Sequence, residues 1–450
     1  MTSTMDRRKR WLAFIVLCFG VLMIVLDTTI VNVALPSIKE DLRFTETSLV
    51  WVVNAYMLTF GGFLLLGGRL GDLYGHRRLF LLGLTLFTLA SLVCGLSNLQ
   101  GLLIGARAAQ GLGGAVVSAV ALSLIMNLFT EPAYRAKAMG VYGFVCAGGG
   151  SIGVLLGGIL TSALSWHWIF LVNIPIGIAV YALCVALLPN ARGQMQNARL
   201  DVAGAVTVTT ALMLAVYVRS PLMPLGLFRL RNVATANVVG VLWAAAMFAW
   251  FFISALYMQL VLGYSALQVG LAFLPANLIM AVFSLGLSAK LVMRFGIRVP
   301  LAVGLLLAAT GLALFAQAPA EGSFALHVLP GMTLLGLGAG VAFNPVLLAA
   351  MSDVAPNESG LASGVVNTSF MMGGALGLAI LASLAGARTE HLLASGVDAL
   401  IARNGGYHIA FGIGALFAAL AAMLSVMLIR VLPYAPARSS EPAIEALERT

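Results

Sequence analysis

One carboxylate and one guanidinium lie deep inside the long apolar stretches of this sequence. Asp27 falls within the first stretch, 11–35, and Arg107 falls within the fourth, 100–129. At about 1.5 Å of helical rise per residue, Asp27 lies about 24 Å into its helix and Arg107 roughly 10 Å into a helix of opposite direction. The depths match, so we expect the two side chains to interact, either directly or through Gln110 and water.

An acid inside a membrane span is costly unless it is paired or does work. Burial and a neighbouring arginine act in opposite directions on the proton affinity of a carboxyl group. We therefore expect Asp27 to exchange a proton when Arg107 moves or a substrate arrives. A static ion pair that only joins the first helix to the fourth is the alternative interpretation.

The composition requires lipid as the solvent for this chain. Of its 450 residues, 61% are hydrophobic and only 9% are charged, and the mean hydropathy is +1.02. Such a chain has too little polar surface to cover a soluble core, so we expect an all-α, multi-pass membrane protein. The expected spans lie near 11–35, 49–68, 79–97, 100–129, 138–162 and 165–188, and then near 233–262, 267–289, 299–317, 326–352, 359–385 and 407–432.

A repeated turn divides the chain into two related six-helix bundles. The turn from Gly68 to Arg77 follows the second span, and a similar turn from Ala289 to Arg298 follows the second span of the later set. Repeated halves with the substrate site between them are typical of transporters. We expect an N-terminal bundle at 1–189, a linker at 190–231, a C-terminal bundle at 232–432 and a tail at 433–450.

The basic residues orient the chain in the membrane. The net charge is +9, but the lysines and arginines form short clusters between spans, so a nucleic acid partner is not expected. The positive-inside rule places the N-terminus and the tail in the cytoplasm. The apolar segment 201–218 would invert the second half if it crossed alone, so we expect it to lie in the interface or to pack laterally.

Glycines and charged residues in the first copy of the turn are candidates for a conformational latch. The glycines allow a tight bend, and the charged side chains can bond to neighbouring helix ends. An ordinary basic loop would explain the arginines, but it would explain neither the acid nor the repetition. The candidate residues are Gly68, Arg69, Asp72, Gly75, Arg77 and Arg78.

Glycines in the fifth span recur every four residues. Gly149, Gly153 and Gly157, with Gly158 beside them, predict a smooth helix face that suits two halves rocking against each other. The same stretch matches a hydrolase nucleophile pattern around Ser151. The five histidines all lie in loops or near span ends, so a base is missing and an intramembrane enzyme is disfavoured. We expect no metal and no cofactor.

Rings, amides and thioethers inside the spans are candidates for a substrate cavity. Each alone is more often a packing residue than a ligand contact. Together they favour large ligands that are apolar or weakly cationic, because charge is scarce around them. The candidates are Asn32, Trp51, Asn54, Tyr56, Gln110, Trp243, Trp250, Phe251, Tyr257, Met258, Gln259, Asn277, Asn344, Asn367 and Met371.

These motifs together resemble the major facilitator superfamily, and specifically its drug:proton antiporter-2 branch of multidrug exporters. The run 26–36 is similar to the first-helix signature of that branch, and 107–111 is similar to its fourth-helix motif. The run 153–158 resembles the fifth-helix antiporter motif, with Val154 where proline is usual. The resemblance implies a two-bundle, alternating-access exporter driven by the proton gradient, with Asp27 and Arg107 in the coupling role.

We therefore expect a proton-coupled transporter of the bacterial inner membrane that exports small hydrophobic or cationic molecules and contributes to antibiotic resistance. Its expected partners are protons, the lipid bilayer and the substrate, and the expected state is a monomer. Proton-coupled transport of a specific metabolite is the alternative within the same class. An intramembrane enzyme is the alternative from another class.

Overall fold

The computed structural model describes residues 7–129, 131–188, 229–283, 287–351 and 359–429, and these are helical with no strand. The first half contains α1 (Arg7–Leu42), α2 (Glu46–Tyr74), α3 (His76–Gly95), α4 (Gln100–Leu128), α5 (Pro132–Ala163), α6 (Trp168–Leu171) and α7 (Asn173–Leu187). The second half contains α9 (Arg231–Leu260), α10 (Ala266–Val282), α11 (Ser288–Phe295), α12 (Arg298–Phe315), η4 (Phe324–Val328), α13 (Leu329–Met351), α14 (Ser359–Ala394) and α15 (Ala399–Leu428). The segment 201–218 and the tail 433–450 lie outside the described residues.

Side chains at three helix starts satisfy backbone groups that a first helical turn leaves free. The Thr45 hydroxyl accepts a hydrogen bond from the Ser48 amide at 3.1 Å, and the Thr45 amide donates to the Ser48 hydroxyl at 3.0 Å. Ser265 and Gln268 form the same capping box at the start of α10, and the Asp398 carboxylate caps α15. These caps fix where the helices begin after short turns.

Several helices differ in length from the predicted spans. The span expected at 165–188 is formed by α6 and α7, which join at Val172 with helical φ and ψ of −59° and −25°, and Pro175 lies in the first turn of α7, where it has no amide hydrogen to donate. Within the span expected at 267–289, α10 ends at Val282 and α11 begins at Ser288, and residues 284–286 lie outside the described residues. α14 runs past the predicted boundary at 385, and α15 begins before the predicted 407. A helix continues into polar sequence wherever its backbone remains bonded, so hydropathy underestimates helix length.

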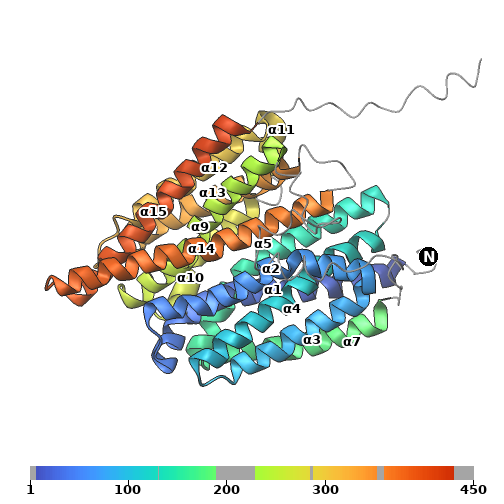
Figure 1. Ribbon diagram of the computed structural model, residues 1–450, viewed down its shortest axis with the longest axis horizontal. Coiled ribbons are helices and arrows are strands. Elements are labelled where there is room, and N and C mark those ends of the chain that lie inside the picture. Colours follow the sequence, from blue (N-terminus) through green and yellow to red (C-terminus); the bar gives the residue numbers. More distant parts are fainter. Residues whose placement is uncertain (1–6, 130, 189–228, 284–286, 352–358, 430–450) are drawn as a thin grey trace, which may run out of the picture.

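The helices form two groups that follow the two halves of the chain. In the first group α1 packs against α5 and α7, and α4 packs against α2 and α3. In the second group α9 packs against α14 and α15, and α12 packs against α13 and α15. Figure 1 shows α12, α13 and α15 above α1, α3 and α4, with the N-terminus on the side opposite the α14–α15 turn. Contacts between the groups are made mainly by α2 with α14 and by α5 with α10.

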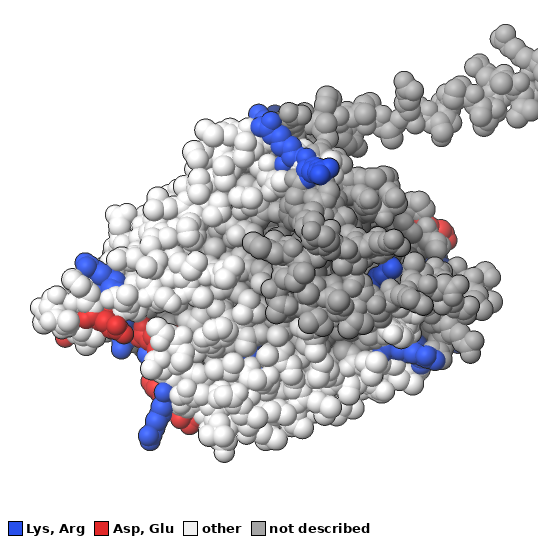
Figure 2. Space-filling model, in the orientation of Figure 1, with Lys and Arg blue, Asp and Glu red and all other residues white. Residues whose placement is uncertain are grey.

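The surface is that of a protein surrounded by lipid. Figure 2 shows charged side chains near the edges of this face, and the areas drawn in white between them carry almost no charge. Large apolar side chains such as Leu82, Ile178 and Leu416 are exposed, as expected where the neighbour is an acyl chain. Ten helices in the described part of the chain are long and apolar enough to cross a membrane. The multi-pass membrane protein predicted from composition is therefore confirmed.

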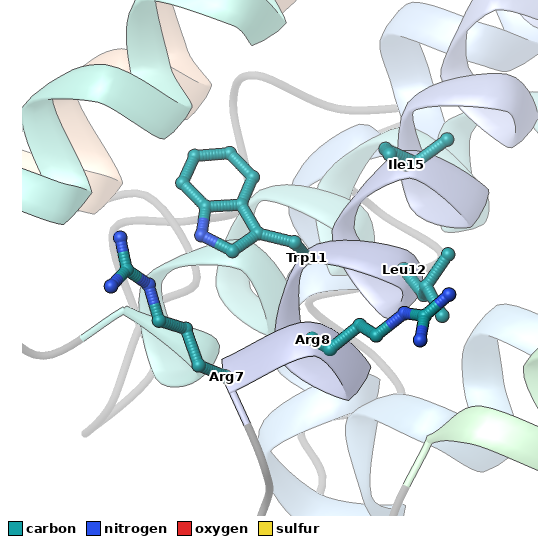
Figure 3. A pocket seen from close by; sticks show the side chains of 5 residues that line it. All are labelled: Arg7, Arg8, Trp11, Leu12 and Ile15. Carbon is teal, nitrogen blue, oxygen red and sulfur yellow. The ribbon is translucent and has the colours of Figure 1, made fainter.

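A shallow groove of about 480 Å³ borders the start of α1. It is lined by Arg7, Arg8, Trp11, Leu12 and Ile15, and Figure 3 shows the two guanidinium groups pointing to opposite sides of the helix. Arg7 lies about 30 Å along α1 from Asp27, at roughly 1.5 Å per residue. The groove is therefore a surface feature of the basic end of α1, separate from the buried acid.

Candidate functional site

Asp27 and Arg107 form a direct ion pair inside the first helix group. The Nη1 atom of Arg107 lies 2.6 Å from Oδ2 of Asp27. Asp27 is 0% exposed and Arg107 is 1% exposed, so neither charge is in contact with solvent. A buried pair of this kind depends on further hydrogen bonds to the atoms that the partner charge leaves unsatisfied.

Neutral amides supply those further bonds to the carboxylate. The Nε2 atom of Gln110 donates to Oδ1 of Asp27 at 2.7 Å, and the Nδ2 atom of Asn173 donates to the same oxygen at 3.2 Å. Nη1 of Arg107 also donates to Oε1 of Gln110 at 2.8 Å, which fixes the orientation of that amide. Three donors from α4 and α7 therefore hold one carboxylate from α1.

The Ser91 hydroxyl connects the two amides. It accepts hydrogen bonds from Gln110 at 3.0 Å and from Asn173 at 2.9 Å. It donates its own hydrogen to the carbonyl of Phe170 at 3.0 Å. The carbonyl of Phe170 at the end of α6 and the amide of Asn173 at the start of α7 therefore both lie at the site. Sequence analysis predicted neither Ser91 nor Asn173, because a neutral polar residue in a span does not stand out as a charge does.

The other side of Arg107 contacts α2. Its Nε atom donates to the carbonyl of Val52 at 2.9 Å. Its guanidinium carbon lies 4.3 Å from the ring centroid of Tyr56 and 5.7 Å from that of Phe170, both within the range of cation–π attraction. The Tyr56 hydroxyl has no hydrogen-bond partner among the described residues. Arg107 is therefore shared between the acid of α1 and the backbone and ring of α2.

A carboxylate is the one group in this network that can take up or release a proton near neutral pH. Neutralising Asp27 would remove the charge that holds Nη1 of Arg107, while the bonds from Arg107 to α2 would remain. Each of its polar residues is at most 2% exposed, so a proton can reach the carboxylate only when the surrounding helices move. Among the described residues there is no group of three His, Cys, Asp or Glu side chains that could hold a metal ion.

The predicted cavity residues do not gather at one place. Gln110 belongs to the Asp27 network, and the Asn32 amide donates to the carbonyl of Thr28 in its own helix at 3.3 Å. The Tyr257 hydroxyl donates to the carbonyl of Pro319 at 2.8 Å, which ties α9 to the turn after α12. Trp51 is 50% exposed on α2. These positions are explained by local structure, and their role in substrate binding stays a prediction.

Other candidates lie in the second helix group. Trp250 and Phe251 of α9 pack on Phe273 of α10, with ring centroids 6.0 Å and 5.4 Å apart respectively. Asn277 lies one turn beyond Phe273 on α10. Among the rest, Asn54, Trp243 and Met258 are buried, and Gln259, Asn344, Asn367 and Met371 are partly buried.

Charged and polar side chains join the two helix groups at one end of the molecule. Oε1 of Glu46, at the start of α2, lies 3.0 Å from Nζ of Lys39 and 3.2 Å from Nε of Arg403 in α15. Six residues before Lys39 in α1, the carbonyl of Val33 accepts a hydrogen bond from Nε2 of Gln259 in α9 at 3.1 Å. We call this region, which includes the α1–α2 and α14–α15 turns, the Glu46 end. Sequence analysis did not predict a role for Glu46.

The glycines of the fifth span pack mainly within the first helix group. A Cβ atom at Gly153 would lie 3.0 Å from the carbonyl oxygen of Leu26, and one at Gly157 would lie 2.7 Å from that of Ile30, both in α1. Gly149 also faces α1, whereas Gly158 faces the backbone of Ala266 in α10. The close approach is therefore chiefly between α5 and α1, and only Gly158 of these four contacts the other half.

The repeated turn carries an arginine with the same contact in both halves. Gly75 has a φ of +94° and Gly296 a φ of +73°, values that favour glycine. Nη2 of Arg77 donates to the carbonyl of Val185 near the end of α7 at 2.7 Å, and Nε of Arg298 donates to that of Ile429 after α15 at 3.1 Å. Each arginine satisfies a carbonyl at the end of the last helix of its half.

Of the other residues predicted for the latch, Gly68 faces Ala119 of α4. Arg78 is exposed and Arg69 is half-buried. The side chain of Asp72 lies outside the described residues. A latch function for this turn stays a prediction.

The sequence model of the Major Facilitator Superfamily matches residues 17–378, more than half of the chain. The chain belongs to this superfamily. A bacterial homologue of the human lysosomal transporter Spinster, solved in an inward-facing and unoccupied conformation, has a TM-score of 0.72 at 16% identity and covers 95% of this chain and 98% of its own. A nucleoside transporter has a TM-score of 0.72 at 11% identity, covering 93% and 100%. This facilitator-family chain is thus a membrane transporter and not an enzyme.

Bacterial relatives are similar over nearly the whole length. A puromycin resistance protein of Streptomyces alboniger is 37% identical over 463 residues, which cover 94% of this chain and 92% of the relative. A cephamycin export protein of Amycolatopsis lactamdurans is 37% identical over 471 residues, covering 96% and 94%. A multidrug resistance protein of Mycobacterium tuberculosis is 33% identical over 412 residues, covering 84% and 76%. The predicted resemblance to the multidrug exporter branch is therefore confirmed.

Proposed function

We propose that this facilitator-family chain exports small hydrophobic or cationic molecules in exchange for protons, and that Asp27 binds the proton. The observation that carries the proposal is the buried Asp27 carboxylate, which is held by Arg107, Gln110 and Asn173 and has no access to water. An ionisable group kept in such a place is expected to work rather than only to pack. The relatives named for resistance and export support the outward direction.

We orient the chain with its N-terminus in the cytoplasm, because the basic start of α1 belongs on that side. The Glu46 end then faces the outside of the cytoplasmic membrane. A proton enters from outside and binds Asp27, and substrate binding from the inside favours release of that proton to the cytoplasm. A single chain contains all of these parts and works as a monomer.

Arg107 offers a physical path from the proton to the contact between the helix groups. When Asp27 is neutral, its attraction for the guanidinium weakens, and Arg107 can follow its remaining partners, Val52 and Tyr56. Both partners are on α2, and α2 packs against α14 of the second group. A proton-dependent shift of Arg107 would thus bias the arrangement of the two groups.

Replacing Asp27 with asparagine tests the proposal. In proteoliposomes with an imposed pH gradient, Asp27→Asn should abolish gradient-driven ethidium transport, because the amide cannot release a proton in this pH range. Downhill exchange of the dye without a gradient should persist, since the amide oxygen can still accept a hydrogen bond. Gradient-driven transport at the wild-type rate in Asp27→Asn would refute the role of this residue.

Asp41 provides a control on the same helix. Its Oδ2 atom accepts a hydrogen bond from Nε1 of Trp166 at 2.8 Å, close to the end of α1. Asp41→Asn also removes one negative charge from α1, but the new amide oxygen can still accept from the indole. Gradient-driven transport should therefore be retained in Asp41→Asn and lost only in Asp27→Asn.

A further inference from the structure

A small cavity in the second helix group has a single unsatisfied donor in its wall. The cavity is about 20 Å³ in volume, and it is bordered by Trp243 of α9, by Phe343, Val346 and Leu347 of α13, and by Asn367 and Phe370 of α14. Trp243 is 0% exposed, and its indole Nε1 has no hydrogen-bond partner among the described residues. A volume of this size has room for roughly one water molecule or one small group of a larger ligand.

The cavity lies beside the contact between the two helix groups. Phe370 stacks edge-on against Phe343, with ring centroids 6.1 Å apart, and against Phe248 of α9 at 5.9 Å. A Cβ atom at Gly374, one turn beyond Phe370, would meet both Phe248 and Met57 of α2. The aromatic wall is therefore within reach of a molecule that moves between the groups. Phe343 is 40% exposed, so one edge of this wall is accessible.

The lining selects for a particular ligand chemistry. None of the side chains around the cavity is charged, so nothing there would neutralise a cation. Trp243 and Trp250 both have a buried indole N–H without a partner among the described residues, but of the two only Trp243 borders the cavity. A buried N–H without a partner costs free energy that an acceptor placed in the cavity would recover. An acceptor on an otherwise apolar ligand would satisfy the N–H, while Phe343 and Phe370 would contact the adjoining ring.

We propose that Trp243 and the cavity beside it form a subsite for neutral aromatic compounds that carry a carbonyl or ether oxygen, with the oxygen accepting the Trp243 indole hydrogen. This inference deepens the proposed export function and rests on it, because it names the substrate class of the same transporter. The ring of such a compound lies against Phe343 and Phe370, and only its oxygen-bearing edge enters the cavity.

Two probes that differ in one group test the subsite. Fluorenone and fluorene share a flat aromatic frame, but fluorenone has a carbonyl where fluorene has a methylene. Dissociation constants for both can be measured on the purified full-length protein from ligand-dependent thermal unfolding, without any proton gradient. Wild type should bind fluorenone roughly 2- to 10-fold more tightly than fluorene, the gain expected from one net hydrogen bond.

Matched variants assign that preference to one indole. Trp243→Phe removes the N–H and should bind the two probes equally. Trp250→Phe also removes a buried, unpartnered indole N–H, but Trp250 packs in the α9–α10 aromatic cluster and should keep the preference. If Trp243→Phe does not fold, Val346→Ile serves instead, because the added methylene fills the cavity and should also erase the preference.

The outcomes are decisive in each direction. Equal affinities in wild type, no binding of either probe, or a fluorenone preference that survives in Trp243→Phe would overturn the subsite. Loss of the preference in Trp243→Phe and its retention in Trp250→Phe would support it. A failure of proton exchange at Asp27 would appear in the gradient-driven transport assay and leave these dissociation constants unchanged, so the two proposals can fail separately.

Discussion

The side-chain amide of Asn173 bridges Asp27 and Ser91. Its Nδ2 atom donates both to Oδ1 of Asp27 and to the hydroxyl of Ser91. Because α7 carries Asn173 and α1 carries Asp27, this single side chain positions the acid against a helix that contributes no charge to the site. We therefore treat Asn173 as a positioning residue for proton binding.

Asn173→Leu should destabilise the protein and slow transport. Leucine has a similar volume but donates no hydrogen bond, so the carboxylate and the Ser91 hydroxyl each lose a partner, at a cost of about 1–3 kcal/mol. Thermal unfolding of the purified protein should show a lower midpoint, and gradient-driven dye transport should fall severalfold. Asn237→Leu is the control, because the buried Asn237 amide donates only to the carbonyl of Val233 in its own helix and Asn237 is not a predicted site residue. Equal losses in the two variants would contradict the positioning role.

The sequence reveals Asp27, Arg107 and Gln110, but it does not reveal Ser91 or Asn173. Asp27 and Arg107 stand out because charges are rare inside spans, and the helical rise alone places them at one depth. Ser91 and Asn173 resemble many other polar residues in spans, and only the tertiary arrangement of α3 and α7 brings them to the carboxylate. Gln110 is recognisable because it lies one helical turn from Arg107, although it was also expected to line a substrate cavity.

At the scale of the helix, α5 depends on glycine at defined positions against α1. A Cβ atom at Gly157 would lie 2.7 Å from a backbone oxygen of Ile30, which cannot move aside as a flexible side chain can. At Gly150 the nearest atom would be Cγ2 of Thr29 at 3.8 Å, an ordinary contact. Both glycines are in α5, so alanine at either position raises the helix propensity alike. A difference in stability between the two variants then measures the packing contact.

Gly157→Ala should destabilise the protein, whereas Gly150→Ala should not. Overpacking at a backbone contact costs about 1–3 kcal/mol, while alanine in a helix is favoured over glycine by roughly 1 kcal/mol where space permits. The midpoint of thermal unfolding in detergent should fall for Gly157→Ala and stay or rise for Gly150→Ala. Similar midpoints for both variants would show that α5 does not need the close approach at Gly157.

Hydropathy predicts the existence of the helices better than their ends. The long spans are correct because their apolar length is unambiguous, yet α1 begins before and ends after its predicted span, and α14 extends nine residues past its predicted end at 385. The repeat of the turn is visible in the sequence, but its physical reason is not. Only the structure shows that Arg77 and Arg298 each bond to the end of the last helix in their own half.

At the scale of the whole molecule, Glu46 is a charged residue with ion-pair partners in both helix groups. It contacts Lys39 within the first group and Arg403 in the second. Partly exposed pairs are worth about 0.2–1 kcal/mol, which is enough to change a population by roughly 1.5- to 5-fold. The Glu46 end can therefore be held closed without being locked, as alternating access requires.

Arg403→Ala should increase the fraction of molecules that are open at the Glu46 end. Spin labels attached at Glu40→Cys and Ser395→Cys, which are exposed positions on the two groups, can report the separation by double electron–electron resonance. Of the four native cysteines, Cys18, Cys94 and Cys184 are buried and should react poorly with the label, and Cys146 is replaced by alanine in every variant. Arg403→Ala should add longer distances to the distribution, and Lys39→Ala should not, because Lys39 and Glu46 belong to the same group. Identical distributions in these two variants would rule out a gating role for the Arg403 contact.

The polar partners of the Asp27 carboxylate all come from the first half of the chain, whereas the residues around the Trp243 cavity all come from the second. Under the two proposals made above, the proton-binding site and the substrate preference are encoded in separate stretches of the gene. Substitutions that change substrate specificity can then accumulate in the second half without altering the proton-binding site in the first. Selection by new toxic compounds would then change the substrate specificity of such transporters while their proton coupling is retained.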